Sequence, residues 1–547
     1  MSATVPTFAI DPSLDSIMLS VKGSIMCICG SHNGQFVDKR DFTTGSNCFN
    51  SGCRVPVIEH IDGPQSVTSD SNFVFFGSMI MAVAVESSNL HERIALRILL
   101  ITGPNPRWLM LGFQLSTSFL SMWISNTATT AMMVPIVIAV IKELDVCQRR
   151  QSDPEANMVA DDAEEILDLD LVPPRQLNIY KGLLLSICFS ASIGGTATLI
   201  GTGSNIVLNG YLQKAYRSLS PVTFASWLAF AFPQVIVLQA ICWLWLQILY
   251  VGFKKMDRSH EGMVSRMLKK KYETLGPIRY EEKNILVCFS ILIALWLTRE
   301  PGFIAGWGNL FTEGMVTDGT AAMSISMLLF VLPAENPLKF LASNQVSTTP
   351  IRTIMTWRLM RDKFSWSTLL LLGGGYGMAA GVESSGLSDY IGVRLSKLDF
   401  LPELVFISVS CVMVTLLTEF SSNVATASIF IPMVASIARI HKTNPLIYIL
   451  PVTLASSYAF MFPSGTPPNA IVFSVKILRV FDMAIGGSML NIAAFFLSQF
   501  TTHTYAHIIF DMEKKHYSYS PNANNSSLIF ADNPEYKTSL LLSLFPD

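Results

Sequence analysis

The sequence predicts an all-α polytopic membrane protein made of two structural repeats, and three observations support this fold class. Half of the 547 residues are apolar and only 14% are charged, whereas soluble domains carry about 25% charged residues. Long apolar segments recur from residue 71 to residue 510. Polar residues in the first half of that region return in the same order in the second half. Most of the protein surface is therefore expected to face the lipid bilayer.

Composition also argues against several other classes of protein. The net charge is only −2, so nothing indicates a nucleic-acid partner. No His lies within 92–259 or 261–440, where the polar turns occur, so an enzyme would lack a base or metal ligands there. We therefore expect no enzyme, no catalytic residues and no cofactor. A zinc site is disfavoured because tight CxxC pairs and flanking His are missing, and free thiols are expected at Cys27, Cys29, Cys48 and Cys53.

Apolar segments of sufficient length predict the membrane spans. They lie near 73–86, 107–124, 180–200, 222–252, 284–298, 320–333, 364–382, 402–418, 446–462 and 485–510. Two shorter apolar segments, 125–141 and 422–438, directly follow polar Ser-Asn turns. Non-helical backbone is tolerated at membrane depth only where it is buried or lines a cavity, so both are expected to belong to re-entrant helical hairpins.

The segments outside the spans complete the expected domain organisation. The loop at 254–283 is rich in Lys and Arg, which places it on the cytoplasmic side. Asn524 and Asn525 are overlapping glycosylation acceptors, which favours an extracellular C-terminus. The expected regions are a divergent polar N-terminal segment (1–70), a first repeat (71–253) with a polar loop (142–178), the basic loop (254–283), connecting spans and loop (284–363), a second repeat (364–510) and a polar tail (511–547).

The internal repeat is visible at one constant offset along the chain. Val85-Glu86-Ser87-Ser88 recurs as Val382-Glu383-Ser384-Ser385. At the same offset Ser125-Asn126 meets Ser422-Asn423, and Pro135 meets Pro432. Chance similarity between apolar helices aligns Leu, Val and Ala, but it does not readily align Glu, Asn and Pro. The sequence therefore contains two related halves.

A second pair of related turns follows at a shorter offset. Gly201-Thr202-Gly203-Ser204-Asn205 resembles Gly465-Thr466-Pro467-Pro468-Asn469, and the second half has no counterpart of the 142–178 loop. Each half thus has a Ser-Asn turn and, later, a Gly-Thr-x-x-Asn turn between apolar segments. Such turns also pack helices together in membranes, but two matched pairs favour broken helices that meet near the middle of the bilayer, as in the inverted repeats of secondary transporters.

The residue types in these turns indicate what they would bind. Free N–H groups at helix N-termini attract anions, whereas free carbonyls, hydroxyls and amides suit Na⁺. A channel is less well supported because two-fold repeats with broken helices favour alternating access. A proton-coupled carrier would need His or a carboxylate at the turn centres, where neither occurs. Three carboxylates border spans and are candidates for ion pairing or proton binding, namely Glu86, Glu383 and Glu419.

Four segments resemble the signatures of a known family, the divalent anion:sodium symporters. They are Trp123–Thr129, Gly194–Thr196, Ser422–Thr426 and Thr466–Phe473. This family contains the sodium/dicarboxylate, sodium/citrate and sodium/sulfate cotransporters, and the resemblance runs from about Ser71 to Asp511. It implies a multi-pass homodimer in the plasma membrane, in which a transport domain moves against a scaffold in an elevator mechanism and carries a small anionic substrate with Na⁺.

The resemblance also implies the binding residues, matched motif by motif. One Na⁺ site would contain Ser121, Ser125, Asn126 and Gly201, and its repeat-related partner Thr418, Ser422, Asn423 and Gly465. The substrate carboxylates would contact Asn126, Thr127, Thr202, Asn423, Val424, Thr466 and Pro467. Val424 and Thr466 resemble the di- and tricarboxylate branch more than the sulfate branch, and Gly203 resembles citrate-preferring members. A sodium/sulfate cotransporter of the same family is the alternative.

The chain departs from the family pattern in two places. The family has membrane spans ahead of Ser71, whereas residues 1–69 are polar here. A non-transporting isoform that lacks N-terminal spans is therefore a further alternative. Ser204 stands where the family usually has Pro, and the loss of a residue that fixes φ is expected to loosen that turn.

Overall fold

The computed structural model describes most of the chain between residues 70 and 512. The described residues are 70–152, 172–216, 222–252, 261–300, 306–312, 315–336, 352–366, 402–441, 443–510 and 512, with a few more between 368 and 381. Among them the secondary structure is helical, apart from an isolated β-bridge between Pro333 and Thr353, which confirms the all-α prediction. The expectations for the N-terminal cysteines, for Glu383 and for the glycosylation acceptors concern residues outside this set.

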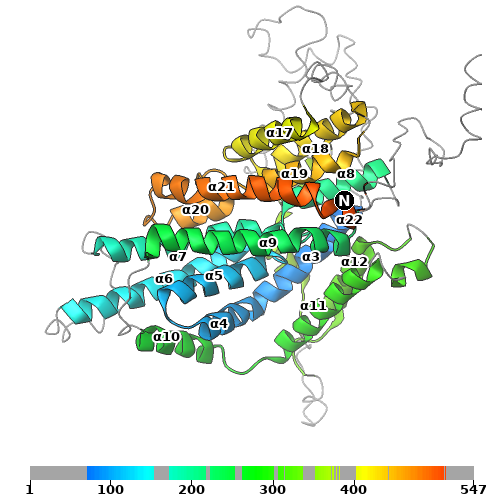
Figure 1. Cartoon of the computed structure of the whole chain (residues 1–547). Coiled ribbons are helices and arrows are strands. Elements are labelled where there is room, and N and C mark those ends of the chain that lie inside the picture. Colours follow the sequence, from blue (N-terminus) through cyan, green and yellow to red (C-terminus); the bar gives the residue numbers. More distant parts are fainter. Residues whose placement is uncertain are drawn as a thin grey trace, which may run out of the picture. The chain divides into compact units, whose positions relative to one another are not determined.

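The helices of the first half can be followed in Figure 1, and two of the breaks between them fall at the predicted polar turns. They are α3 (Asp70–Ser87), α4 (Leu90–Thr102), α5 (Pro106–Ser121), α6 (Asn126–Ser152), α7 (Pro174–Gly195), α8 (Gly203–Tyr216) and α9 (Phe224–Leu246), which continues as the π-helix η3 (Gln247–Val251). The Ser-Asn turn separates α5 from α6, and the Gly-Thr turn separates α7 from α8. Both turns therefore interrupt helices, as predicted.

The remaining helices include a similar succession in the second half. They are α10 (Glu261–Thr274), α11 (Tyr280–Arg299), the 3₁₀ turn η5 (Trp307–Leu310), α12 (Asp318–Val331), α14 (Trp357–Lys363), α17 (Glu403–Thr418), α18 (Asn423–Ile440), α19 (Pro445–Ser457), α20 (Pro467–Phe473), α21 (Val480–His503) and α22 (Ala506–Ile509). The order hairpin, broken helix, long helix is the same for α5–α9 and for α17–α21. Pro135 and Pro432 lie inside the equivalent helices α6 and α18.

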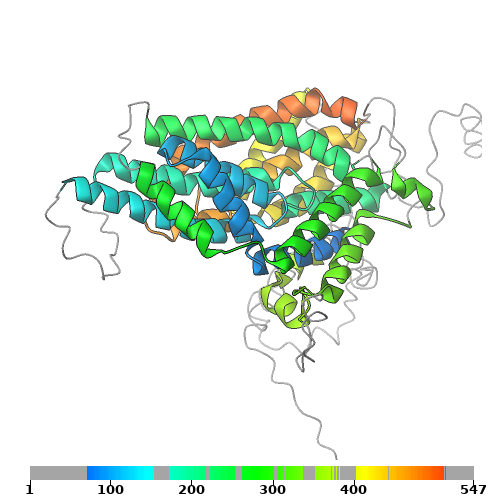
Figure 2. The same ribbon diagram turned by 90° about the horizontal axis from the view of Figure 1, so that it is seen from below.

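Several helices are long and apolar enough to cross a membrane. Among the described residues these are Asn126–Val146, Pro174–Gly195, Phe224–Val251 and Val480–His503. Helices α3 and α4 pass the same test together but meet at a bend of 67°, which is visible in Figure 2. Asn89 lies at this bend with φ 60°, a left-handed conformation that Asn tolerates better than most residues. These helices are those of a multi-pass membrane protein.

The structure differs from the sequence-based expectation in three helical regions. Helix α6 continues to Ser152 and α7 begins at Pro174, so both ends of the expected polar loop 142–178 are helical. Helix α10 lies within the expected basic loop 254–283, and α4 was not predicted. Each of these segments carries several charged residues, and a search for long apolar stretches does not detect a polar or amphipathic helix.

Close packing between α5 and α7 places the first hairpin against the first broken helix. Gly194 allows this contact, because a Cβ atom there would lie 2.4 Å from the main-chain oxygen of Ser118. In the second half α17 and α18 both pack against α19. Small residues at such crossings are typical of membrane helices, where van der Waals packing supplies much of the association energy.

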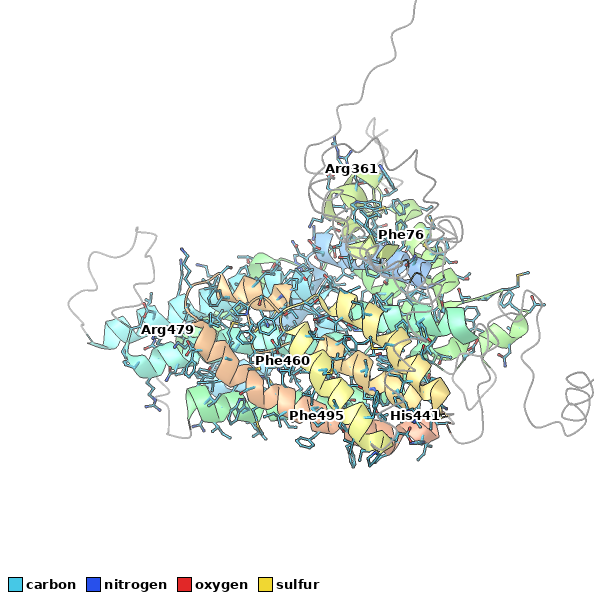
Figure 3. All side chains as sticks on the ribbon, turned by 90° about the horizontal axis from the view of Figure 1, so that it is seen from above. Phe76, Arg361, His441, Phe460, Arg479 and Phe495 are labelled. Carbon is cyan, nitrogen blue, oxygen red and sulfur yellow. The ribbon has the colours of Figure 1, made fainter. Side chains whose placement is uncertain are left out.

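The two halves also pack against each other. The second helix of the first hairpin, α6, contacts α20, and the second helix of the other hairpin, α18, contacts α8. The side chain of Phe460 lies in the loop between α19 and α20 and is fully buried. Figure 3 shows it amid the helices, whereas Phe495 and His441 lie at their margin. Most residues of the two loops that interrupt the broken helices, 196–202 and 458–466, are buried as well.

Candidate functional site

The first Ser-Asn turn is held by a hydroxyl and an amide that share one carbonyl partner. Ser121 is the last residue of α5, and its Oγ donates to the main-chain oxygen of Ala191 in α7 at 2.7 Å. Asn126 is the first residue of α6. In the orientation that satisfies its hydrogen bonds, its amide nitrogen faces Ser121 Oγ at 2.6 Å, Ala191 O at 3.1 Å and Gly201 O at 3.3 Å. Three of the four predicted residues of this Na⁺ site are thus in contact.

The second Ser-Asn turn has the same kinds of partner, but the amide oxygen of Asn423, not its nitrogen, faces the hydroxyl. Thr418 is the last residue of α17, and its Oγ1 lies 2.7 Å from the main-chain oxygen of Ser456 in α19 and 2.8 Å from Asn423 Oδ1. Asn423 is the first residue of α18, and its Nδ2 donates to Ser457 O at 3.5 Å. The hydroxyl, amide and carbonyl of the first half therefore have counterparts at matched positions in the second half.

The loops that interrupt the broken helices are closed by two equivalent asparagines. In the first half Asn205 Nδ2 donates to Thr196 O at 3.2 Å and to Thr198 O at 2.8 Å. In the second half Asn469 Nδ2 donates to Ala459 O and to Phe462 O, both at 3.0 Å. Each asparagine is the final residue of a Gly-Thr-x-x-Asn motif. We call these asparagines clamps, because each holds two carbonyls of its loop. We did not predict this role from the sequence, although both asparagines were part of the matched motifs.

Two glycines allow the main chain to pass close to Asn126. A Cβ atom on Gly195 would lie 2.3 Å from the side-chain amide of Asn126, and one on Gly201 would lie 2.4 Å from the main-chain oxygen of Gly195. The equivalent Gly465 has more room, since its nearest neighbour would be Ala459 Cβ at 3.1 Å. A side chain at position 201 would therefore clash with the backbone, whereas one at position 465 would meet a less crowded environment.

A carboxylate organises the second loop and has no counterpart in the first. Glu419 follows Thr418, is only 1% exposed, and accepts hydrogen bonds from the backbone N–H groups of Phe460, Met461 and Phe462 at 2.9–3.2 Å. Asn491 Nδ2 in α21 donates to the same carboxylate at 2.6 Å. From the sequence we identified Glu419 as an ionisable residue that borders a span. Its partners could not be predicted, because any residue type can supply a backbone N–H group.

The halves are joined at the tips of these elements. Ser204 Oγ in α8 donates to the main-chain oxygen of Asn423 at 3.4 Å. A Cβ atom on Gly203 would lie 2.3 Å from Val424 Cγ2. The Ser204 hydroxyl thus forms a contact that a Pro at this position could not make.

The predicted residues differ in their access to solvent. Ser121, Gly201, Thr202, Thr418, Gly465 and Thr466 are buried, Ser125, Asn126, Asn423 and Val424 are half-buried, and Thr127, Ser422 and Pro467 are exposed. Within the described part of the chain, Thr466 Oγ1 is buried and has no hydrogen-bond partner. A buried hydroxyl without a partner is costly unless something else binds it.

Apart from the carboxylate of Glu419, the side chains of the cluster are neutral and polar. Carbonyls near the C-termini of α7 and α19, those of Ala191, Ser456 and Ser457, face the cluster, and α6, α8 and α18 begin beside it. Carbonyls with hydroxyl and amide oxygens suit Na⁺, and helix N-termini suit carboxylates. Among the described residues no group of His, Cys, Asp and Glu could hold a metal ion. Paired broken helices with such groups define the class of secondary transporters.

Comparisons with known proteins agree with this class. The profile of the sodium:sulfate symporter transmembrane region matches residues 63–512. The Na(+)/citrate cotransporter of Rattus norvegicus is 41% identical, over 84% of this chain and 86% of that protein. The sodium-dependent low-affinity dicarboxylate transporter 1 of Caenorhabditis elegans is 40% identical, over 81% and 79%. The Na(+)/dicarboxylate cotransporter 3 of Rattus norvegicus is 37% identical, over 81% of each.

The chain therefore belongs to the sodium:sulfate symporter family. It is a multi-pass membrane transporter and not an enzyme. Among solved structures, the crystal structure of the Alcanivorax borkumensis YdaH transporter is similar with a TM-score of 0.49 at 10% identity, over 82% of this chain and 88% of that chain.

Proposed function

We propose that this chain is a sodium-coupled symporter of di- and tricarboxylates, including citrate and succinate, in the plasma membrane. The observation that carries the proposal is the matched pair of hydroxyl, amide and carbonyl contacts around Asn126 and Asn423. These contacts belong to helices that pack together across the two halves. The relatives named for Na⁺/citrate and dicarboxylate cotransport support the same coupling ion and substrate class.

We assign one Na⁺ to each Ser-Asn turn. The first site takes Ser121, Ser125, Asn126 and Gly201, and the second takes Thr418, Ser422, Asn423 and Gly465. In both sites the neighbouring helix C-terminus, that of α7 or α19, contributes the negative end of its dipole. Neutral oxygen ligands and a helix C-terminus together favour a monovalent cation without requiring a carboxylate.

The substrate carboxylates bind between the two sites, where helices begin. Their partners are Asn126, Thr127, Thr202, Asn423, Val424, Thr466 and Pro467. The N-termini of α6 and α18 supply free N–H groups, and Thr466 Oγ1 is a buried hydroxyl that lacks a partner among the described residues. The two Na⁺ would balance the charge of a dianion placed here and reduce that of a trianion to one.

The two halves act as inverted repeats within a homodimer. Helices α5–α8 and α17–α20 form the mobile transport domain, and α3, α11 and α12, which pack together, belong to the scaffold. Movement of the transport domain carries Na⁺ and substrate across the bilayer in an elevator mechanism. The resemblance to the family motifs and the packing of α6 on α20 and of α18 on α8 support this assignment.

Uptake into cells that express the full chain tests the proposed function. We expect saturable uptake of labelled citrate or succinate when external Na⁺ is present, and none when choline replaces Na⁺. Uptake that survives the replacement would contradict sodium coupling. Sulfate is measured in parallel, since sulfate uptake above that of both carboxylates would favour a sodium/sulfate cotransporter, the function in the family's description.

A further inference from the structure

A chain of buried hydrogen bonds joins the two loops that interrupt the broken helices. Thr196 directly follows the end of α7, and Tyr458 directly follows the end of α19. The hydroxyl of Tyr458 lies 3.3 Å from Thr196 Oγ1. Thr196 is 0% exposed and Tyr458 is 2% exposed, so water does not compete for this bond.

The direction of the bond follows from its neighbours. Thr196 Oγ1 donates its single hydrogen to Ile193 O at 2.7 Å, so the Tyr458 hydroxyl must donate to Thr196. Gln234 Nε2 in α9 lies 3.4 Å from the same tyrosine hydroxyl and donates to it. Gln234 Oε1 in turn accepts from Thr501 Oγ1 in α21 at 3.1 Å. The bonds from Gln234 to Tyr458, from Tyr458 to Thr196 and from Thr196 to Ile193 all run the same way, and hydrogen bonds in series strengthen one another at low dielectric constant. Thr501 Oγ1 lies equally close to Ser498 O, at 3.1 Å.

Both ends of the Tyr458–Thr196 bond lie next to residues of the Na⁺ sites. On the first side, Gly195 precedes Thr196 and abuts Asn126, and Thr196 O is held by the clamp residue Asn205. On the second side, Ser457 precedes Tyr458 and its carbonyl accepts from Asn423. The next residue, Ala459, is held by the second clamp, that of Asn469. A single hydroxyl therefore connects the two clamped loops.

We propose that Tyr458 is a positioning residue that couples the two Na⁺ sites. This inference rests on the proposed function, because it takes the two Ser-Asn turns as Na⁺ sites. Binding of Na⁺ at one turn fixes the carbonyls of its loop, and the Tyr458–Thr196 bond transmits part of that ordering to the other loop. The second Na⁺ then binds to a loop that is already ordered. Coupling of this kind is reciprocal, so either ion promotes binding of the other.

Substitution of Tyr458 by Phe isolates the hydroxyl. The ring contact with Phe460, at 5.8 Å between centroids, is retained, and Thr196 keeps its own bond to Ile193. The protein is therefore expected to fold and to reach the cell surface. Tyr250 in η3 provides a control, because its hydroxyl donates to the main-chain oxygen of Asp482 in α21 at 2.8 Å, and neither residue belongs to the two loops.

The experiment measures labelled citrate uptake as a function of Na⁺ concentration, normalised to surface expression. We expect Tyr458→Phe to flatten the sigmoidal Na⁺ curve, to lower its Hill coefficient toward one and to raise the half-saturating Na⁺ concentration about threefold to tenfold, as expected for one lost hydrogen bond. Tyr250→Phe should leave both parameters at their wild-type values. An unchanged curve in Tyr458→Phe, or an equal change in Tyr250→Phe, would overturn the proposal.

Variants at the other end of the bond make the test independent of one substitution. Thr196→Ser retains the hydroxyl and should behave as wild type, whereas Thr196→Ala should flatten the Na⁺ curve as Tyr458→Phe does. The double variant should be no worse than either single one, and additive losses would contradict a shared bond. Wild-type uptake without Na⁺ dependence would instead refute the proposed function, so the two failures are distinguishable.

Discussion

The two halves of the molecule stabilise equivalent polar turns by different means. In the first half the loop meets the hairpin through neutral groups: Thr198 Oγ1 donates to Met122 O and accepts from Gly201 N. In the second half the position equivalent to Met122 is Glu419, whose carboxylate accepts three backbone N–H groups. The first half relies on tight glycine packing and the second on a buried charge. The two halves thus share the contacts of the Ser-Asn turns but differ in the interactions that stabilise the neighbouring loops.

The largest effect should be common to both halves. Asn126→Ala and Asn423→Ala each remove the amide that ties a hairpin to its broken helix, and each should abolish citrate uptake while surface expression is retained. Uptake and surface biotinylation of the two variants, measured side by side, check this expectation. Wild-type transport in either variant would remove that asparagine from its Na⁺ site and break the equivalence of the halves.

Removal of the buried charge should affect the second half alone. Glu419→Leu leaves the backbone N–H groups of the 460–462 loop unpaired, and each buried unpaired group costs about 1–3 kcal/mol. We expect uptake to fall by more than about tenfold and the thermal midpoint of the purified protein to drop. Met122→Leu is the matched control in the first half. It keeps the carbonyl contact and should cost less than about 1.5 kcal/mol.

The smallest effects should come from the paired glycines. Gly201→Ala places a methyl group 2.4 Å from a backbone oxygen, whereas the nearest atom to the same group in Gly465→Ala is a methyl at 3.1 Å. Because small displacements of binding groups reduce rates, we expect Gly201→Ala to reduce uptake about threefold to tenfold and Gly465→Ala by less than about threefold. Initial rates of citrate uptake at saturating Na⁺ test this expectation. Equal losses of uptake in the two variants would contradict the difference in packing between the two loops.

The polar turns were predictable from the sequence because their side chains repeat. Ser-Asn pairs at one constant offset located the ends of both hairpins, and the helices begin at Asn126 and Asn423 as that pattern suggested. The Gly-Thr-x-x-Asn motifs likewise marked the interruptions between α7 and α8 and between α19 and α20. Repetition of polar residues in an apolar background is a strong pattern, since few other constraints produce it.

Other features had no such pattern. Partners of Glu419 and of the site asparagines are main-chain groups, which any residue type can supply. The bond between Tyr458 and Thr196 depends on how two loops far apart in sequence meet. The two residues do not occupy equivalent positions of the repeat, so the repeat pattern did not pair them. Helix α4 was missed because its charged residues interrupt the apolar stretch by which spans are recognised.

The contacts of α6 with α20 and of α18 with α8 restrict how this protein can be re-engineered. A chimera that takes only one half from a relative would pair foreign hairpins with native short helices. Positions 203, 204 and 424 would then have to be exchanged together, because Ser204 and Gly203 meet Asn423 and Val424 across the boundary. Substrate preference is therefore best transferred as a set of facing residues from both halves, not as a contiguous stretch of chain.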